Sequence, residues 1–367
     1  MNAFTDNSRP ENKLRVLFWN ELHWPHVGGI ERFSEELFAA LGPRGFEFRV
    51  LTSALPGCPE EEVREGVRIH RLPLRAGLSG SPADLKRNLE SIRRLKESFR
   101  PHLTHLNTSG PSFLYHYLTM KTTPHPTLFT FHFDATRENA VETLRKMLAA
   151  SDRVTAVSRD TLEKARQFLP EIRGKDSVIH NGLPRPTGPL PAPTSPQAAA
   201  FLSWGRLAAN KGFDVGLRAF AKVAALYPQA RLTLAGDGPE REVLWALRRQ
   251  LGLEERVAMP GYLAPAELER EIQACTALLM PSLEQECFGL VALEAMQRGK
   301  AVIASRCGGL AEVVEDPITG LLCPTGDESA LAQAMRLLIE KPDLATAMGA
   351  AGKSRAEKLF SLEAMAR

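Results

Sequence analysis

The 367-residue sequence lacks the features that mark several broad classes of protein. Its five cysteines include no CxxC pair, which argues against a zinc site or a disulfide framework and is typical of a reducing cytosol. No apolar run reaches the roughly 18 residues that a membrane-spanning helix needs. The net charge of +3 is too small to indicate a nucleic-acid partner. The sequence therefore predicts a cytoplasmic protein that does not cross a membrane and binds no nucleic acid.

The length predicts two domains of about 180 residues each, because a single core does not ordinarily grow to this size. Residues 1–13 are polar and of mixed charge, which predicts a disordered tail rather than a signal peptide. Residues 184–198 carry a dense run of prolines, which neither a helix nor a central strand accommodates. We therefore predict an N-terminal domain over 14–183, a linker over 184–198 and a C-terminal domain over 199–367.

Short apolar segments alternate with helical patterns in both halves of the chain. The predicted strands are Leu14–Trp19, Phe46–Thr52, Val67–Leu72, Leu103–Leu106, Thr127–Phe131 and Asp152–Val157, then Ala200–Trp204, Arg231–Ala235, Val257–Met259, Ala277–Met280, Ala301–Ala304 and Gly320–Leu322. This alternation predicts an α/β protein with a parallel sheet between helices in each of two Rossmann-like domains. We expect the carboxyl edges of the two sheets to face each other across a cleft.

The stretch from Met280 to Val314 is the most informative. A predicted strand ends there, a loop with Glu286 follows, and a helix is predicted from Leu290 to Gln297. In an open α/β sheet such a corner lies where ligands bind, and the N–H groups at a helix start suit a phosphate. Glu286 and Glu294 are eight residues apart, one before the helix and one inside it. Both could therefore face one ligand.

Signals in the N-terminal half are weaker. Gly28 and Gly29 stand at a strand-to-helix corner, where backbone N–H groups could approach an anion, although a tight turn is the simpler explanation. They do not form a GxGxxG motif, and no acid follows at the expected distance, which argues against a nicotinamide cofactor. His132 ends a predicted strand at the expected cleft, where a structural histidine is the commoner alternative.

A predicted helix opened by Ser81 and Asp84 has an apolar stripe and a basic side. The basic residues assigned to that side are Lys86, Arg87, Arg93, Arg94, Lys96 and Arg100. Such a helix could lie on anionic lipid at the inner face of a membrane. A solvated helix face is the favoured interpretation, because Glu90 and Glu97 interrupt the basic patch.

Taken together, these segments resemble the retaining GT-B glycosyltransferases of the family 4 type, also described as glycosyl transferases group 1. The resemblance covers nearly the whole chain. Its N-terminal motifs are PHVGGIER, TFHFD around His132, AVS ending at Ser158, and His180-Asn181-Gly182. Its C-terminal motifs are SWGRLAANKG, LAGDGPE, VAMPGY, the E-x7-E pair, GGLAEVV and TGLLCPTGD. An isolated E-x7-E pair is a weak signal, whereas this ordered set is specific.

The resemblance implies transfer of a sugar from a nucleoside diphosphate sugar (NDP-sugar), with UDP or GDP as the favoured nucleotide, and with no cofactor and no essential metal. It implies that Arg206 and Lys211 neutralise the diphosphate, that Glu294 accepts the ribose hydroxyls, and that Glu286 and His132 support the sugar. These four, Glu286, His132, Arg206 and Lys211, are the expected catalytic residues. The expected donor-binding set is Gly28, Gly29, Gly205, Arg206, Lys211, Gly236, Met259, Tyr262, Glu286, Cys287, Phe288, Gly289, Leu290 and Glu294.

The resemblance also places the acceptor in the N-terminal domain and favours a front-face route, in which the departing phosphate oxygen takes the acceptor's proton. We predict that His23, Trp24, His26 and Asn107, with the aromatic segment Phe113–Tyr117, shape the acceptor site. The acceptor class stays open between a glycan, a lipid-linked precursor and a small molecule.

Two departures from the family pattern concern its C-terminal and central motifs. Gly299-Lys300-Ala301 replaces the proline usual after the acid-bearing helix, and Pro184 stands where an aspartate usually follows the His180-Asn181-Gly182 motif. Two alternatives are an NDP-sugar epimerase of the same shape and a catalytically silent nucleotide-sugar-binding subunit. The presence of Glu286, Arg206, Lys211 and His132 argues against the silent subunit.

Overall fold

The computed structural model describes residues 13–26, 28–107, 110, 112–133, 141–186, 199–284 and 286–367. The predicted tail, apart from Lys13, and most of the predicted linker lie outside these ranges. The described residues divide into two compact units. The first comprises the chain up to Val157, then Thr161–Ile179 and Ala366, and the second comprises Ser158–Asp160, His180–Met365 and Arg367. After Ile179 the chain stays in the second unit from His180 to Met365, so this passage lies three residues before the predicted end of the N-terminal domain at Leu183.

The first unit contains an eight-stranded sheet within its described residues. Its strands are β1 Leu14–Trp19, β2 Phe46–Ser53, β3 Glu61–Arg64, β4 Val67–Leu72, β5 Leu103–Leu106, β6 Thr127–Phe131, β7 Arg153–Ala156 and β8 Asp176–Val178. The spatial order is β3-β4-β2-β1-β5-β6-β7-β8. All neighbours pair in parallel except β3 and β4, which are antiparallel. The expectation of a wholly parallel sheet was therefore wrong at this edge, where a short turn makes an antiparallel hairpin.

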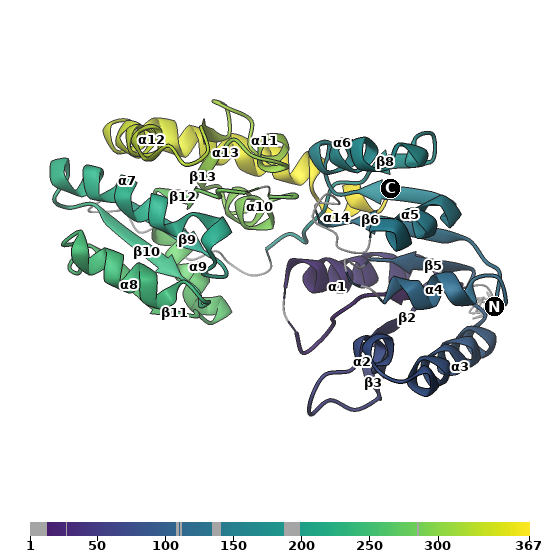
Figure 1. Ribbon diagram of the computed structural model, residues 1–367. Coiled ribbons are helices and arrows are strands. Elements are labelled where there is room, and N and C mark those ends of the chain that lie inside the picture. The colour runs from purple at the N-terminus through teal and green to yellow at the C-terminus, as the bar shows by residue number, and fades with distance from the viewer. Residues whose placement is uncertain are drawn as a thin grey trace, which may run out of the picture. The chain divides into compact units, whose positions relative to one another are not determined.

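Helices cover both faces of this sheet (Figure 1). They are α1 Gly29–Leu41, α2 Leu74–Ser79, α3 Pro82–Phe99, α4 Phe113–Thr119, α5 Val141–Ala150 and α6 Arg159–Phe168. In β1, Leu17 packs in one core cluster with residues of α3, α4 and α5. Its neighbour Phe18 instead contacts Phe38 of α1, with ring centroids 4.9 Å apart. Because successive strand side chains point to opposite faces, α1 covers the face opposite to α3 and α4.

Two predictions in this unit involve α4: the assignment of Lys96 to a solvated basic side was wrong, and the acceptor role of the aromatic segment stays a prediction. The aromatic segment predicted to shape the acceptor site forms this helix, and Phe113, Tyr115 and His116 are fully buried. Lys96, assigned to the basic side of its helix, is 1% exposed, and its Nζ donates to Nδ1 of His116 and Oγ1 of Thr119. The capping box of α3 is confirmed, with Ser81 and Asp84 as its two members.

The second unit is built on a six-stranded parallel sheet. Its strands are β9 Ala200–Trp204, β10 Arg231–Ala235, β11 Val257–Gly261, β12 Ala277–Met280, β13 Ala301–Ser305 and β14 Gly320–Cys323. Its helices are α7 Phe213–Leu226, α8 Arg241–Gln250, α9 Pro265–Ala274, α10 Leu290–Gln297, α11 Leu310–Val313, α12 Glu328–Glu340, α13 Pro342–Leu359 and α14 Leu362–Met365. Phe201 of β9 packs with α7 and α12, whereas the adjacent Leu202 packs with α9. Helices therefore cover both faces here too.

The strand order of the second sheet, β11-β10-β9-β12-β13-β14, contains one topological switch point. The chain moves outward from β9 to β11, then returns to the other side of β9 with β12. This is the order of the doubly wound α/β fold, in which ligands bind at the carboxyl ends of the strands beside the switch. In the first sheet the corresponding switch lies between β1 and β5.

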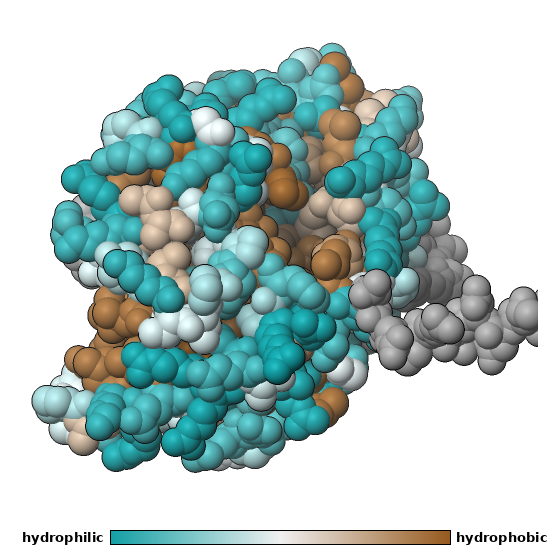
Figure 2. Space-filling model, turned by 90° about the vertical axis from the view of Figure 1, so that its right-hand side faces the viewer, coloured by the Kyte–Doolittle hydropathy of each residue, from teal (hydrophilic) through white to brown (hydrophobic). Residues whose placement is uncertain are grey.

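Among the described residues, no helix combines the length and the apolarity needed to cross a bilayer. Figure 2 shows one face of the molecule, on which hydrophobic residues form separate groups between hydrophilic ones.

Candidate functional site

Two side chains meet at the switch point of the second sheet. Lys211 follows β9 in a short 3₁₀ turn, Ala209–Lys211, and Glu286 lies in the loop after β12. The Lys211 ammonium donates to Oε2 of Glu286 over 2.6 Å, and Oγ of Ser282 donates to the same oxygen over 3.4 Å. The Lys211 side chain is 31% exposed and that of Glu286 is 18% exposed. The pair is thus held in place and still open to a ligand.

The backbones around this pair approach closely because glycine stands next to Lys211. Gly212 has a φ of 65°, and a Cβ built on it would come within 2.0 Å of the carbonyl oxygen of Pro281. The N–H of Leu283 donates to the carbonyl of Asn210 over 2.9 Å. The loops after β9 and β12 are therefore fixed against each other, and only glycine fits at that contact.

Arg206 lies in the same loop as Lys211 and is exposed. Within the described part of the chain its guanidinium has no ion-pair partner. Its neighbour Leu207 is buried and donates its N–H to the carbonyl of Asp237 over 2.9 Å. The backbone that carries Arg206 is therefore anchored, while its charge is available to an anion.

Glycines also join the ends of β9, β10 and β11. Gly205 and Gly236 have φ values of 141° and 129°, and a Cβ on Gly236 would lie 1.9 Å from the carbonyl oxygen of Gly205. The N–H of Gly236 donates to the carbonyl of Gly261 over 2.7 Å. Within β11, Met259 is half-buried against the core, and Tyr262, directly after the strand, is 79% exposed. These predicted donor-binding positions thus lie along one edge of the sheet.

The helix after Glu286 presents its N-terminus at the same edge. Its N-cap is Gly289, with a φ of 101° and no side-chain cap. Because no side chain caps it, the first N–H groups from Leu290 onward are available to a ligand, and the helix dipole adds a partial positive charge. Glu294 lies one turn inside this helix and is 8% exposed.

The segment before α10 is anchored by contacts with residues from other parts of the second unit. Phe288 is 3% exposed, and its ring lies 6.0 Å from that of His180 and 5.6 Å from that of Phe360. The N–H of Gly309 donates to the carbonyl of Glu286 over 2.7 Å, and a Cβ on Gly309 would lie 2.4 Å from the carbonyl oxygen of Cys287. Sequence reasoning had assigned no role to Gly212 or Gly309. The only indication in the sequence is that each lies in a family motif, Gly212 in SWGRLAANKG and Gly309 in GGLAEVV.

His132 is the predicted catalytic residue of the first unit. His132 follows β6, its ring is 4.6 Å from that of Phe33, and its buried Nε2 has no hydrogen-bond partner among the described residues. Burial, with a smaller effect of His105, lowers the pKa of His132 to about 3, so the ring is neutral at physiological pH. An unsatisfied buried nitrogen is uncommon, and a ligand that donates or accepts there would satisfy it.

The loop after β1 carries the other predicted residues. Gly28 is the extended N-cap of α1, followed by Gly29, and a Cβ on Gly28 would lie 2.5 Å from Oε2 of Glu31. Trp24 is half-buried under the guanidinium of Arg64, which lies 3.6 Å from the ring centroid. His26 is exposed, with Nδ1 3.3 Å from Glu31.

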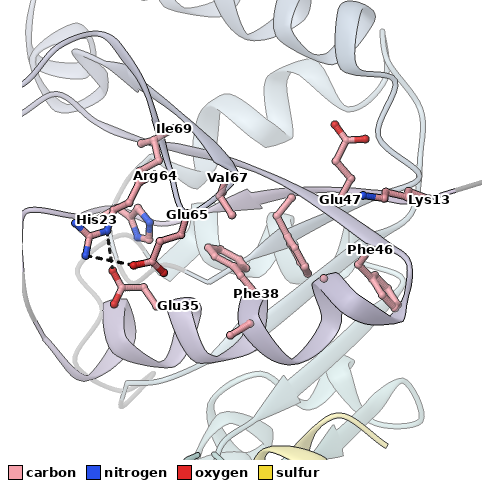
Figure 3. A pocket seen from close by; sticks show the side chains of 14 residues that line it. Lys13, His23, Glu35, Phe38, Phe46, Glu47, Arg64, Glu65, Val67 and Ile69 are labelled. Carbon is pink, nitrogen blue, oxygen red and sulfur yellow. Dashed lines mark ion pairs between the residues drawn. The ribbon is translucent and has the colours of Figure 1, made fainter. Parts of the chain in front are cut away.

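Two predicted acceptor residues are buried. His23 is 3% exposed, and burial, helped by Arg71 and Arg64, lowers its pKa to about 4. It lines a pocket of about 340 Å³ between α1 and strands β2 and β4, in which Arg64 pairs with Glu35 (Figure 3). Asn107 is 1% exposed and donates its side-chain amide to Oδ1 of Asn20 over 3.1 Å. Both acceptor roles stay predictions.

The two halves of the sequence match two family models. Residues 193–355 match the model described as glycosyl transferases group 1, and residues 27–185 match glycosyltransferase family 4. This chain belongs to the group 1 glycosyltransferases. The glycosyltransferase is 29% identical over 359 residues to the 2-deoxystreptamine N-acetyl-D-glucosaminyltransferase of Streptomyces fradiae, covering 85% of this chain and 83% of that protein. It is 26% identical to the glycogen synthase of Mycobacterium tuberculosis, over 93% of this chain and 89% of that one.

Solved structures show the same fold. Sucrose-phosphate synthase from Thermosynechococcus elongatus superposes with a TM-score of 0.81 at 24% identity, over 96% of each chain. The Anabaena protein HepE, in complex with UDP, superposes with a TM-score of 0.78 at 21% identity, over 96% of this chain and 97% of that one. The group 1 glycosyltransferase therefore has the GT-B fold of two Rossmann-like sheets, as predicted.

Proposed function

We propose that this glycosyltransferase moves a sugar from an NDP-sugar to an acceptor hydroxyl with retention of configuration, in the synthesis of a glycan, glycolipid or glycoside. The observation that carries this proposal is the arrangement at the switch point of the second sheet. An exposed arginine, a lysine–glutamate pair and an uncapped helix N-terminus lie on loops at one sheet edge.

The diphosphate would be held by fixed positive charge. As the glycosidic bond breaks, the leaving diphosphate gains negative charge, which must be stabilised for the reaction to proceed. Arg206 supplies a guanidinium without an ion-pair partner among the described residues, and Lys211 supplies an ammonium. The first N–H groups of α10 add partial positive charge that needs no rearrangement. Among the described residues, no group of three or more His, Cys, Asp and Glu side chains could hold a metal ion. Metal independence stays part of the proposal and is tested by assay in EDTA.

The two glutamates would have different tasks. Glu294, inside α10 and 8% exposed, would accept hydrogen bonds from the two ribose hydroxyls, since one carboxylate has two acceptor oxygens. Glu286 would contact the hydroxyls of the donor sugar, because its oxygen already bonds the lysine expected beside the phosphates. A phosphate beside Lys211 and a sugar beside Glu286 are thus the adjacent parts of one ligand.

Retention would follow a front-face route. A double displacement needs a carboxylate nucleophile under the anomeric carbon. Glu286 is bound to an ammonium, which lowers the nucleophilicity of its carboxylate. The departing phosphate oxygen would therefore take the acceptor's proton. His132 is neutral at physiological pH, so it would act as a hydrogen-bonding group rather than as a cation.

The nucleotide is best tested first with UDP, because the HepE structures contain UDP, UDP with glucose, and UDP-glucose. The experiment is a thermal-shift screen of UDP, GDP, ADP and TDP and their sugars. A ligand at 100 times its Kd stabilises the protein by about 2.7 kcal/mol. Stabilisation by at least one nucleotide, and transfer of its sugar without epimerised or free sugar as the main product, supports the proposal. The absence of any shift would contradict it.

Two variants separate the proposed roles of the glutamates. Glu294→Ala should weaken nucleotide binding, whereas Glu286→Ala should mainly lower turnover and leave nucleotide affinity near that of the unmodified enzyme. The reverse result would overturn both assignments. Cytoplasmic location and peripheral contact with a membrane stay predictions, which cell fractionation tests.

A further inference from the structure

A second concave site lies in the first unit, between α3 and the strands β2, β3 and β4. It has a volume of about 480 Å³, within the range of small-molecule pockets. We call it the α3 pocket and define it by six of its lining side chains: Arg49, Glu61, Arg68, His70, Ser91 and Arg94. None of these residues has a role in the proposed transfer reaction.

The sheet wall of the α3 pocket places two arginines side by side. Arg49 of β2 and Arg68 of β4 are register partners in a parallel pair, so their side chains leave the same face of the sheet. Arg68 pairs with Glu61 at 3.6 Å. Arg49 has no ion pair among the described residues, and its guanidinium is fixed over the ring of Phe99, 4.5 Å from the centroid. Adjacent like charges repel unless an anion lies between them.

The helix wall adds a third guanidinium and a hydroxyl. Ser91 and Arg94 are three residues apart on α3, so they lie on one face of that helix and turn toward the strands. Arg94 is 79% exposed, and its ion-pair partner Glu90 is 4.0 Å away on the same helix. Ser91 makes no side-chain hydrogen bond with any described residue. The α3 pocket thus offers donors from two opposite walls.

The acids of the α3 pocket are partly engaged. Glu61 accepts a hydrogen bond from Nδ1 of His70 over 3.0 Å in addition to its pairing with Arg68. Glu60 lies exposed at the edge. Of the four arginines that line the pocket, Arg71 already pairs with Glu62. The other three guanidiniums face two carboxylates, one of which is already paired, and the excess positive charge is centred on Arg49 and Arg94.

We propose that the α3 pocket binds a phosphate group, carried by a small molecule or by a lipid headgroup, between Arg49, Arg68 and Arg94. A guanidinium presents two parallel N–H donors that match two phosphate oxygens, and Phe99 holds the plane of Arg49 ready for that geometry. The hydroxyl of Ser91 supplies a further donor. This proposal does not depend on the transfer reaction.

The test uses the full chain with Arg206→Ala, so that the proposed donor site does not contribute to phosphate binding. Inorganic phosphate and glycerol 3-phosphate are titrated by calorimetry at constant ionic strength, with chloride as the reference anion. We expect saturable binding that Arg49→Gln weakens about tenfold, which corresponds to about 1.4 kcal/mol. Arg94→Gln, at a mostly exposed position, gives the same result without risk to the fold.

Arg87→Gln is the matched control. Arg87 lies on the same helix, is 70% exposed and pairs with Asp84, but it does not line the α3 pocket. Its removal should leave phosphate affinity unchanged, whereas a general effect of net charge would weaken binding equally in both variants.

Vesicles distinguish the source of the phosphate. The protein should sediment with phosphatidylglycerol vesicles but not with phosphatidylcholine vesicles if the site binds a lipid headgroup. In that case Arg49→Gln and Arg94→Gln should abolish the sedimentation. Binding of glycerol 3-phosphate without sedimentation assigns the site to a free small molecule. The proposal is overturned if phosphate binds no better than chloride, or if Arg49→Gln and Arg87→Gln have equal effects in every arm.

Discussion

The two units place polar residues at equivalent points of their sheets but use them differently. At the switch between β1 and β5, Asn107 donates to Asn20, and the buried Glu21 accepts from Nε of Arg75 over 2.6 Å and from Oγ of Ser53 over 3.2 Å. At the switch between β9 and β12, Arg206 is exposed and Lys211 and Glu286 are partly exposed.

This difference separates a structural network from a binding site. A buried carboxylate that already accepts several hydrogen bonds has little capacity for a ligand, and removing it leaves its donors unsatisfied. An exposed guanidinium on a fixed backbone can be removed with little effect on folding but loses its contribution to binding an anion. We therefore infer that the first switch point stabilises the loop carrying Trp24 and His26, and that the second binds the donor.

The largest expected effect follows from removing Arg206. Arg206→Ala should lower transferase turnover by about 10²–10³-fold, because one donor to the charge developing on the diphosphate is lost. Its thermal midpoint should stay close to that of the unmodified protein, since Arg206 is exposed. Steady-state kinetics and differential scanning calorimetry measure the two effects.

Arg249→Ala, another exposed arginine of the second unit on α8, is the control and should change neither quantity. Unchanged turnover in Arg206→Ala would remove the main distinction between the two switch points.

The matching change in the first unit is Glu21→Ala. Because Arg75, Ser53 and the N–H of Ser112 would lose their common acceptor, the free energy of unfolding of this unit should fall by about 2–3 kcal/mol. UDP affinity should stay unchanged. Glu65→Ala, at a side chain 78% exposed in the same unit, should cost less than about 0.5 kcal/mol. A loss of nucleotide binding in Glu21→Ala with unchanged stability would reverse the assignment.

A smaller effect concerns the buried Lys96 of the first unit. Burial lowers the pKa of Lys96 to about 7, from 10.5 for an exposed lysine. The folded state therefore binds fewer protons than the unfolded state between these values, and stability falls as the pH falls from 10.5 toward 7. The slope is about 1.4 kcal/mol per pH unit.

Lys96→Met removes this dependence. Between pH 9 and pH 7 the unmodified protein should lose about 2 kcal/mol relative to the variant, measured by hydrogen exchange of the α3 amides. Lys86→Met, at a lysine side chain 78% exposed on the same helix, should keep the dependence. Parallel stability curves for the Lys96 variant and the unmodified protein would show that this lysine is not the titrating group.

Much of the fold could be predicted because the strands are apolar and bounded by turn residues. The bounds of β1, β4, β5, β6 and β12 and of α10 agree with the prediction to the residue. The hairpin strand β3 was missed, since Glu61–Arg64 is mostly charged and takes its place only by pairing with β4.

The residues that prediction misplaced are those whose environment depends on distant parts of the chain. The sequence prediction placed Lys96 with the basic residues opposite the apolar stripe of α3. Its hydrogen-bond partner His116, however, belongs to α4, twenty residues later in the chain. The aromatic residues of α4 resembled a ligand-binding segment because no local signal distinguishes a buried aromatic helix from an exposed one. For the proposed donor site, spacing singled out Glu286 and Glu294 as candidates, whereas the contact between Lys211 and Glu286 required the fold to bring two loops together.

Hydrogen exchange with and without UDP tests the central claim most directly. We expect slowed exchange in the loops 205–212 and 286–294 of the second unit, where Arg206, Lys211 and the start of α10 would contact the nucleotide. The amides of 20–26 and 112–116 in the first unit should exchange at the same rate with and without UDP. Protection confined to the first unit would contradict the assignment of the donor to the switch point between β9 and β12.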